Sequence, residues 1–228
     1  MVGENGDDKK MYPHIEKVRR HGNTMTGKSG NKLDQPTAQG IARLYSWGKD
    51  LREEFPNHQI KGVHSEADRT YISVASVLMG AGITSVDEYL TETSALNVLI
   101  VPKNQLQQLR NMTDVDARNK IIFDDLRDVA KEAGTRIAAY LVKSLQAAVE
   151  QEDQVLDVKF SHGPPMEAAY LVLTGQPISY NNVTRMGGIL EEKGFDLGLR
   201  RDGRLVDIKL QDNPIKTYDL ADLVGMVG

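Results

Sequence analysis

Two histidine–glycine pairs, far apart in the chain, each follow a segment with the apolar pattern of a β-strand. The first segment covers residues 14–19 and precedes His21-Gly22, and the second covers residues 155–160 and precedes His162-Gly163. Only five histidines occur in the 228 residues, so two at strand ends constrain the fold. Ligands of open α/β sheets bind beyond the carboxyl ends of the strands. If both strands belong to one sheet, the two histidines can form one site at that edge.

Helical and strand-like segments alternate along the rest of the chain. Apolar residues at three- and four-residue spacing predict helices, the first of them capped by Thr37, over residues 38–55, 69–79, 117–150 and 166–173. We expect Gly134 to break or bend the longest of these helices. Short apolar runs predict a strand at residues 60–63 and, at 97–101, a buried strand or an apolar segment of a cap. The polar stretch from residue 23 to 35 is expected to be a loop.

This alternation predicts an α/β fold, a three-layer sandwich with a mostly parallel central sheet and helices on both faces. Near the C-terminus, a hairpin is expected between residues 195–199 and 205–210, around Asp202-Gly203. We expect a single domain over residues 1–228, with a flexible tail at 1–12. The segment from about 85 to 154 is too long for a simple crossover, and we interpret it as a helical cap insertion.

The composition excludes several classes of protein. The net charge of −4 gives no reason to expect a nucleic-acid partner, and the absence of cysteine excludes disulfides and thiol catalysis. No run of about 18 apolar residues occurs, so no membrane association is expected. The polar N-terminus lacks the apolar core of a signal peptide, which favours a cytoplasmic location. No metal-binding or nucleotide-binding motif occurs, so we expect no cofactor. The oligomeric state cannot be inferred from the sequence.

The residues around both histidines suit phosphoryl chemistry. A neutral imidazole such as that of His21 is a competent nucleophile, and the guanidinium of Arg20 can bind two phosphate oxygens at once. Arg69, at the start of a predicted helix, and His162 would add further hydrogen-bond donors. Taken singly, Arg20 to Gly22 would be a surface turn and Arg69 a solvated helix residue. The hypothesis therefore rests on their joint order and spacing.

The sequence resembles the histidine phosphatase superfamily, which includes the cofactor-dependent phosphoglycerate mutases. Val18 to Thr24 (VRRHGNT) is similar to the signature of that family. Three further motifs follow in the family's order: Pro36 to Gly40 (PTAQG), Ser65 to Arg69 with Ser73, and Ser161 to Ala168 (SHGPPMEA). Proline replaces the usual leucine in the second motif. The resemblance is good over residues 18–82 and 155–175, loose in the tail and poor in the middle.

The resemblance implies a role for each motif residue. His21 would be the nucleophile that forms a phosphohistidine, and Arg20, Arg69 and His162 would bind the phosphoryl group and stabilise its transition state. The pocket would be lined by Asn23, Thr24 and the Gly163 amide. The phosphoryl group would then pass to water in a phosphatase or to a hydroxyl group in a mutase.

A leaving alkoxide needs a proton, which most members of the family take from a carboxylic acid after the second arginine. Here the run from Asp87 to Glu92 loosely resembles the family's Asp-x-x-Leu-x-Glu segment, which would make Glu92 the acid. The glycine-containing sequence that usually follows is missing. Glu92 would otherwise be a solvated helix residue, and Glu88 and Asp87 are the alternatives. The pairs Asp124-Asp125 and Glu191-Glu192 are expected on solvated faces.

We expect a phosphomonoester hydrolase that acts on a small phosphorylated metabolite or a phosphoprotein. One alternative is a phosphoglycerate-type phosphomutase, although the mutase-specific segments of the family are not recognisable. A second alternative is a catalytically inactive module that binds phosphorylated ligands. The substrate itself is not encoded in the motifs, because specificity would come from the cap.

Overall fold

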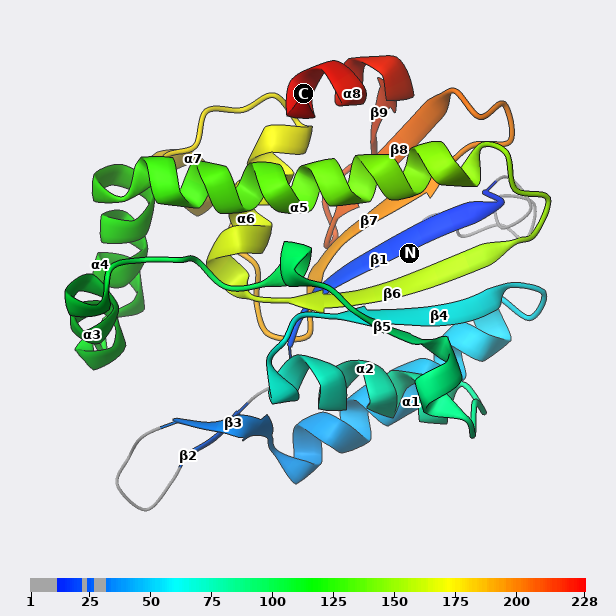
Figure 1. The fold of residues 1–228 in the computed structure, drawn as a ribbon, viewed down its shortest axis with the longest axis horizontal. Helices are drawn as coiled ribbons and strands as arrows, with labels where there is room; N and C mark the ends of the chain where they lie inside the picture. The colour runs from blue at the N-terminus through cyan, green and yellow to red at the C-terminus, as the bar shows by residue number, and fades with distance from the viewer. Residues whose placement is uncertain (1–11, 22–23, 27–31) are drawn as a thin grey trace.

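The computed structural model describes residues 12–21, 24–26 and 32–228 (Figure 1). Most of the segment expected to be a tail, residues 1–12, therefore lies outside the described residues. The centre of the structure is a seven-stranded sheet in the order β5-β4-β6-β1-β7-β8-β9. Its strands are β1 (His14–Arg20), β4 (Gln59–His64), β5 (Leu90–Glu92), β6 (Val155–Ser161), β7 (Gly194–Leu199), β8 (Leu205–Leu210) and β9 (Lys216–Asp219).

The sheet is mixed. The strands from β5 to β1 run parallel, whereas β7, β8 and β9 join β1 through antiparallel pairs. The parallel half places the carboxyl ends of β1, β6 and β4 at one edge, with Arg20 in register with Ser161. The predicted strands at residues 14–19, 60–63 and 155–160 are confirmed, as is the C-terminal hairpin.

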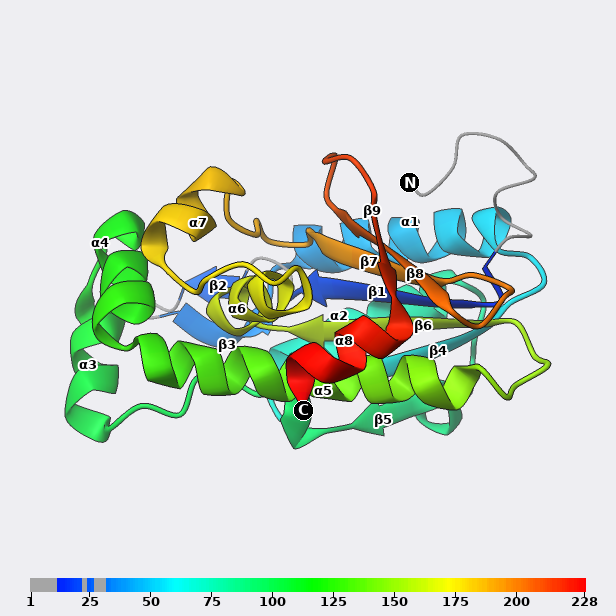
Figure 2. The same ribbon diagram turned by 90° about the horizontal axis from the view of Figure 1, so that it is seen from above.

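Helices cover both faces of the sheet (Figure 2). On one face, α1 (Ala38–Glu54) and α2 (Asp68–Gly80) bury their apolar sides against β1, β4 and β6. On the other face lie α5 (Arg127–Ala148), α6 (Gly163–Leu173) and α8 (Leu220–Val227). Thr37 caps α1 as expected, because its side chain accepts a hydrogen bond from the Gly40 amide at 3.0 Å. The predicted three-layer α/β fold is confirmed.

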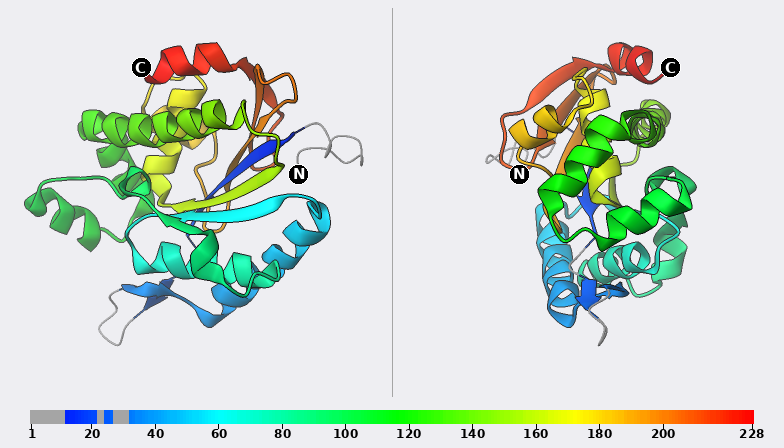
Figure 3. Two further views of the ribbon diagram at one scale, coloured as in Figure 1. Left: turned by 45° about the vertical axis from the view of Figure 1, so that its right-hand side comes forward. Right: turned by 90° about the vertical axis from the view of Figure 1, so that its left-hand side faces the viewer.

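The segment predicted to be a cap carries short helices beyond the carboxyl ends of the parallel strands. The right-hand view of Figure 3 looks onto this edge and shows α3 and α4 in front of it. The elements here are η3 (Ser94–Leu96), α3 (Lys103–Asn111) and α4 (Val115–Lys120), followed along the chain by a π-helical turn, η4 (Ile121–Asp125). The turn η2 (Val86–Tyr89) precedes β5 and lies beside α2 instead. A further short helix, α7 (Tyr180–Arg185), follows α6.

Two local predictions are wrong, and for residues 97–101 one of the two alternatives is excluded. These residues form no strand, because the strand on this edge of the sheet is β5, whereas Leu99 and Val101 pack against an apolar cluster that includes Leu109 and Phe123. The predicted loop at 23–35 contains two short antiparallel strands, β2 (Thr24–Thr26) and β3 (Lys32–Pro36). The long helix is interrupted at Leu126, between η4 and α5, and not at Gly134.

Gly134 lies inside α5 because two helices touch there. A Cβ atom at this position would lie 2.6 Å from the Cβ of Ala168 in α6 and 2.7 Å from its backbone carbonyl carbon. Contacts this short are sterically forbidden, so the glycine permits the close approach of α5 to α6. Within the described part of the chain, no helix is long and apolar enough to cross a membrane.

Candidate active site

The sheet brings the two histidines together, as the sequence predicts. His21 follows β1 directly, and its amide donates a hydrogen bond to the Ser161 carbonyl at the end of β6. His162 is the next residue after β6, and it is the N-cap residue of α6. The two imidazole rings lie with their centroids 5.4 Å apart in an edge-to-face arrangement, and both side chains are buried. The two rings therefore lie side by side at the carboxyl edge of the sheet.

Hydrogen bonds fix the tautomer of His162. Its Nδ1 lies 3.0 Å from Nη2 of Arg69, and its Nε2 lies 3.0 Å from Oγ of Ser65. A guanidinium only donates, so Nδ1 is the acceptor and the proton of the neutral ring is on Nε2. Burial lowers the pKa of His162 to about 2, and Arg69, His21 and Arg20 act in the same direction. The ring is therefore neutral at physiological pH.

Two hydroxyl groups extend this hydrogen-bond chain into α2. Ser65 Oγ lies 2.9 Å from Oγ1 of Thr70, which in turn donates to the Ala67 carbonyl at 2.6 Å. Both hydroxyl side chains are fully buried. Ser65 accepts a hydrogen bond from His162, so its own hydroxyl donates to Thr70. Each hydrogen bond in this chain therefore has a defined donor and acceptor. The chain anchors His162 to the start of α2, where Arg69 is located.

Arg20 forms the other side of the site. Its Nη1 donates to the Ile189 carbonyl at 3.0 Å, and its Nη2 lies 4.0 Å from a carboxylate oxygen of Glu191. Burial lowers the pKa of Arg20, while the nearby carboxylates of Glu191 and Glu167 raise it. Arg69 and Arg118 add positive charge to the same region. A guanidinium that is partly withdrawn from water binds an anion more strongly than an exposed one.

Among the first three residues of α6, Gly163 alone has a backbone N–H group. Gly163 is the first residue of the helix, and a Cβ atom there would lie 3.4 Å from the Arg20 guanidinium. Arg20 thus packs against the Gly163 backbone. The next two residues are Pro164 and Pro165, which have no N–H group. The helix N-terminus therefore contributes the Gly163 amide. Its attraction for an anion is weaker than that of a first turn in which every residue has an N–H group.

The remaining predicted pocket residues are only partly described. Asn23 lies outside the described residues, and so does the side chain of Thr24, whose backbone begins β2. Their expected contacts with a phosphoryl group stay predictions.

The three candidate acids lie on the edge of the sheet formed by β5 and on the adjoining turn. Glu92 ends β5 in register with His64, and its side chain is exposed, without a hydrogen bond or ion pair to any described residue. Asp87 and Glu88 belong to η2, where the Asp87 carboxylate lies 3.4 Å from the Tyr71 hydroxyl. The structure places none of the three in a hydrogen bond with the His21 and His162 pair.

Four residues of the site were not predicted to take part in it. Ser65 and Thr70 hold His162, whereas Glu167 and Glu191 lie near Arg20. Ser65 begins the motif that ends at Arg69, and its place in that motif was a signal that it belongs to the site. Glu167 had a signal of its own, because it is the one charged residue in the otherwise apolar segment from Gly163 to Leu173. The expectation for the pair Glu191-Glu192 is wrong: Glu191 is 28% exposed, and Glu192 binds Arg43 through two hydrogen bonds of 2.7 and 2.8 Å.

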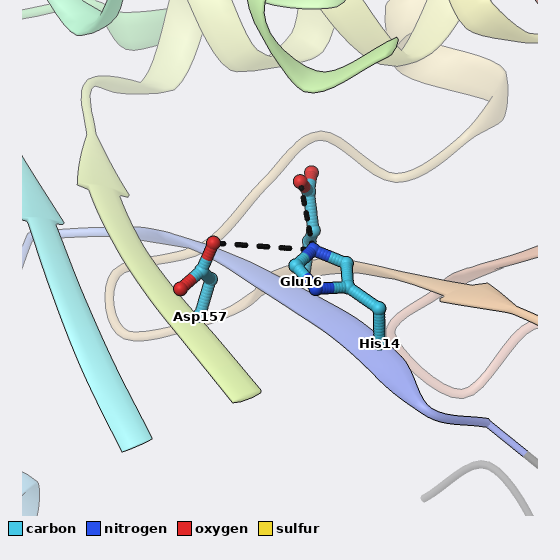
Figure 4. Close-up of side chains that lie close together, drawn as sticks. All are labelled: His14, Glu16 and Asp157. Carbon is cyan, nitrogen blue, oxygen red and sulfur yellow. Dashed lines mark hydrogen bonds and ion pairs between the residues drawn. The ribbon is translucent and has the colours of Figure 1, made fainter. Parts of the chain in front are cut away.

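One group of described residues could supply metal ligands, and it lies away from this site. His14 and Glu16 at the start of β1 and Asp157 on β6 hold their ligand atoms within 4.8 Å of one another (Figure 4). The fully buried ammonium of Lys159 lies 2.8 Å from Asp157 and 3.5 Å from Glu16. A cation is thus already built into the cluster, which we interpret as a buried ion-pair network and not as a metal site.

Solved structures share this fold. A mycobacterial glucosyl-3-phosphoglycerate phosphatase superimposes with a TM-score of 0.56 and 16% identity, covering 88% of this chain and 99% of its own. Phosphoglycerate mutase from Bacillus anthracis gives a TM-score of 0.53 and 13% identity, covering 93% and 94% of the two chains. A histidine-to-alanine mutant of phosphoserine phosphatase from Entamoeba histolytica, in complex with phosphoserine, gives 0.52 and 15%, covering 82% and 91%.

The fold is therefore shared with these phosphatases and with a phosphoglycerate mutase, which confirms the fold that the motif resemblance implies. No protein-family model matches the chain, and no curated protein sequence matches it. With identities this low, the likeness establishes the fold, and the function must be argued from the site.

Proposed function

We propose that this protein is a phosphomonoester hydrolase that works through a phosphohistidine on His21. The observation that carries this proposal is the position of His21, which packs edge-to-face against the neutral His162 at the edge where Arg20 and Arg69 also converge. A nucleophile beside several fixed donors is the arrangement that phosphoryl transfer requires, because charge on the equatorial oxygens must be stabilised in the transition state.

The reaction has two steps. In the first, a ring nitrogen of His21 attacks phosphorus, the bond from phosphorus to the substrate oxygen breaks, and the leaving oxygen takes a proton. We propose Glu92 as the proton donor, with Glu88 and Asp87 as alternatives. In the second step, the same carboxylate takes a proton from water as the water oxygen attacks phosphorus. The phosphorus–nitrogen bond breaks, and both His21 and the acid are regenerated.

The charge of the site supports a phosphorylated substrate. Arg20, Arg69 and Arg118 influence the same region electrostatically, and among the described residues Glu191 is the one carboxylate with an ion-pair distance to Arg20. The net positive potential favours a dianionic phosphate monoester over a neutral ligand. Structures of similar fold include enzymes named for phosphoserine and glucosyl-3-phosphoglycerate, and we infer a small phosphorylated metabolite or a phosphoprotein as substrate here.

The test combines hydrolysis with trapping of the intermediate. The full chain should release phosphate from 4-nitrophenyl phosphate without added metal, and His21→Ala should lose nearly all of this activity. Brief incubation with a 32P-labelled substrate should leave acid-labile, base-stable label on the wild type and none on the variant. Vanadate should inhibit, because its trigonal-bipyramidal form resembles the in-line transition state. Equal hydrolysis by both proteins contradicts the proposal.

A phosphomutase is the second candidate, and the similarity to phosphoglycerate mutase favours it. Interconversion of phosphoglycerate isomers that is faster than phosphate release would establish it in place of a hydrolase. A module that binds phosphorylated ligands without reaction is the third candidate, and the exposed position of Glu92 favours it. Binding of phosphate compounds with no labelled intermediate would establish that module.

A further inference from the structure

Glu167 is a buried carboxyl group next to the phosphoryl-binding side of the site. It lies in α6, five residues after His162, and its side chain is 4% exposed. One carboxylate oxygen, Oε1, accepts a hydrogen bond from the Ile189 amide at 2.8 Å. The other, Oε2, is buried and has no hydrogen-bond partner among the described residues. A buried carboxylate oxygen without a donor is costly, so its presence in the apolar helix needs an explanation.

A single residue, Ile189, connects Glu167 to Arg20 through the two peptide groups on either side of it. Ile189 donates its N–H to Glu167 and accepts a hydrogen bond from Arg20 Nη1 at 3.0 Å. The chain reaches this position through Gly187 and Gly188, whose φ angles of 83° and 62° lie in the region that favours glycine. A Cβ atom at Gly188 would be 3.3 Å from the Glu167 carboxylate. The backbone is therefore shaped to fit closely around the carboxyl group.

The charges around Glu167 connect its protonation to the site. The charged groups that act on it are Arg20 from β1 and Arg118 from α4, and Glu191 lies on the loop that contains Ile189. Burial raises the pKa of Glu167, and the Ile189 amide and the two arginines oppose the rise. When a phosphate dianion binds Arg20, it adds negative charge near Glu167 and makes the ionised carboxylate less favourable.

We propose that Glu167 is a positioning residue for Arg20 and that it takes up a proton when an anion occupies the site. The carboxyl group holds the guanidinium in place through the backbone of Ile189. Phosphate brings negative charge, and Glu167 compensates by binding one proton from solvent at Oε2. This inference rests on the proposed function only in placing the phosphoryl group at Arg20, and it would hold for an enzyme or for a binding module.

The experiment measures binding of inorganic phosphate to the full chain by calorimetry, in buffers of different ionisation enthalpy, between pH 5 and 8. Comparison of the buffers gives the number of protons taken up. Glu167→Gln keeps an oxygen that can accept from Ile189 but cannot ionise. At pH 8 we expect it to bind phosphate about tenfold more tightly than the wild type, a typical coupling between interacting sites. The two affinities should converge towards pH 5, and the wild type should take up more protons than the variant.

Two controls isolate the effect. Glu53→Gln removes an exposed charge from the C-terminal part of α1, at the opposite edge of the sheet, and should behave as the wild type. Glu167→Ala removes the acceptor for Ile189 as well as the charge. Its affinity for phosphate should fall below that of Glu167→Gln, because Arg20 is then less well held.

Equal proton uptake by the wild type and Glu167→Gln overturns the inference. If the variant fails to fold, the test is the carbon-13 chemical shift of the Glu167 carboxyl group in the wild type. Phosphate should move this shift towards the value of a protonated carboxyl group. An unchanged shift overturns the inference. Absence of phosphate binding to the wild type overturns it as well. Failure of the proposed function has a different signature, namely phosphate binding with normal proton uptake but no phosphohistidine on His21.

Discussion

The Nδ1 atom of His162 lies 3.0 Å from Nη2 of Arg69, so the histidine faces an arginine as a hydrogen-bond acceptor. This pairing is compatible only with an unprotonated Nδ1. Burial and three neighbouring groups, Arg69, His21 and Arg20, lower the pKa of His162 to about 2. The candidate active site therefore contains a histidine that folding keeps neutral, and this has a consequence for stability.

The first prediction concerns acid destabilisation. The unfolded chain binds a proton at His162 below about pH 6.5, whereas the folded protein does not until about pH 2, so stability falls as pH falls between these values. From pH 7 to pH 5 this one group should cost about 2 kcal/mol. Urea unfolding at both pH values should show a wild-type loss that exceeds that of His162→Gln by this amount. Identical losses would show that His162 is protonated in the folded state.

The second prediction concerns the hydroxyl group of Ser65. Removing it in Ser65→Ala leaves the Nε2 proton of His162 without its buried acceptor and frees the ring to change tautomer. A lost hydrogen bond of this kind should lower kcat/KM about tenfold. Ser76→Ala is the matched control, because this hydroxyl also lies in the region of α2 and is buried but bonds only to the Ile72 carbonyl. If both variants lose activity equally, Ser65 does not act through His162.

The sequence predicted those parts of the structure whose cause is local. Apolar periodicity located β1, β4 and β6, and the motif residues Arg20, His21, Arg69 and His162 meet as expected because parallel strands end at one edge. The sequence was less informative where contacts between distant segments determine the local structure. The run at residues 97–101 is apolar enough for a strand, yet β5 occupies the sheet edge and the run lies outside the sheet.

Gly134 is a second position where a tertiary contact overrides the prediction from sequence. A glycine in a helical segment predicts a break, because glycine weakens an isolated helix. Here the contact of α5 with Ala168 of α6 requires the missing side chain, so the helix continues. The role of Glu167 was equally hidden, since its partner Ile189 is 22 residues away in the sequence. Such residues become interpretable only when the packing is known.

The third prediction tests this contact. Gly134→Ala should destabilise the protein by about 1–3 kcal/mol, because the new methyl group overlaps the backbone and side chain of Ala168. Gly225→Ala in α8 is the control: no atom lies within 4 Å of its Cβ position, and alanine there should stabilise by about 0.5–1 kcal/mol. Urea unfolding measures both. A stabilising effect at both positions would mean that α5 and α6 are not in close contact at Gly134.

The fourth prediction concerns Lys159, whose ammonium contacts two of the residues drawn in Figure 4, Glu16 and Asp157. Burial lowers the pKa of Lys159, but Glu16 and Asp157 outweigh this effect and the net shift is upward, so the ammonium stays charged. Lys159→Met leaves two acidic side chains without this cation and should cost about 3–5 kcal/mol. Lys61→Met, on the neighbouring strand in register with Asp157, removes an exposed lysine and should change stability by less than about 0.5 kcal/mol. Similar effects of the two substitutions would contradict the assignment of Lys159 to the network.

The fifth prediction decides whether Glu92 supplies the proton for the leaving group. A 4-nitrophenolate leaves readily without a proton, whereas the alkoxide of phosphoserine needs one. If Glu92 is the acid, Glu92→Gln should lower kcat for phosphoserine about 100-fold or more and leave kcat for 4-nitrophenyl phosphate within about threefold. Glu88→Gln and Asp87→Asn are the matched controls, since both lie in η2 a few residues earlier. The variant that shows the selective loss identifies the acid. If all three retain both activities, the proton comes from elsewhere, and the exposed position of Glu92 at the end of β5 is then simply that of a solvated residue.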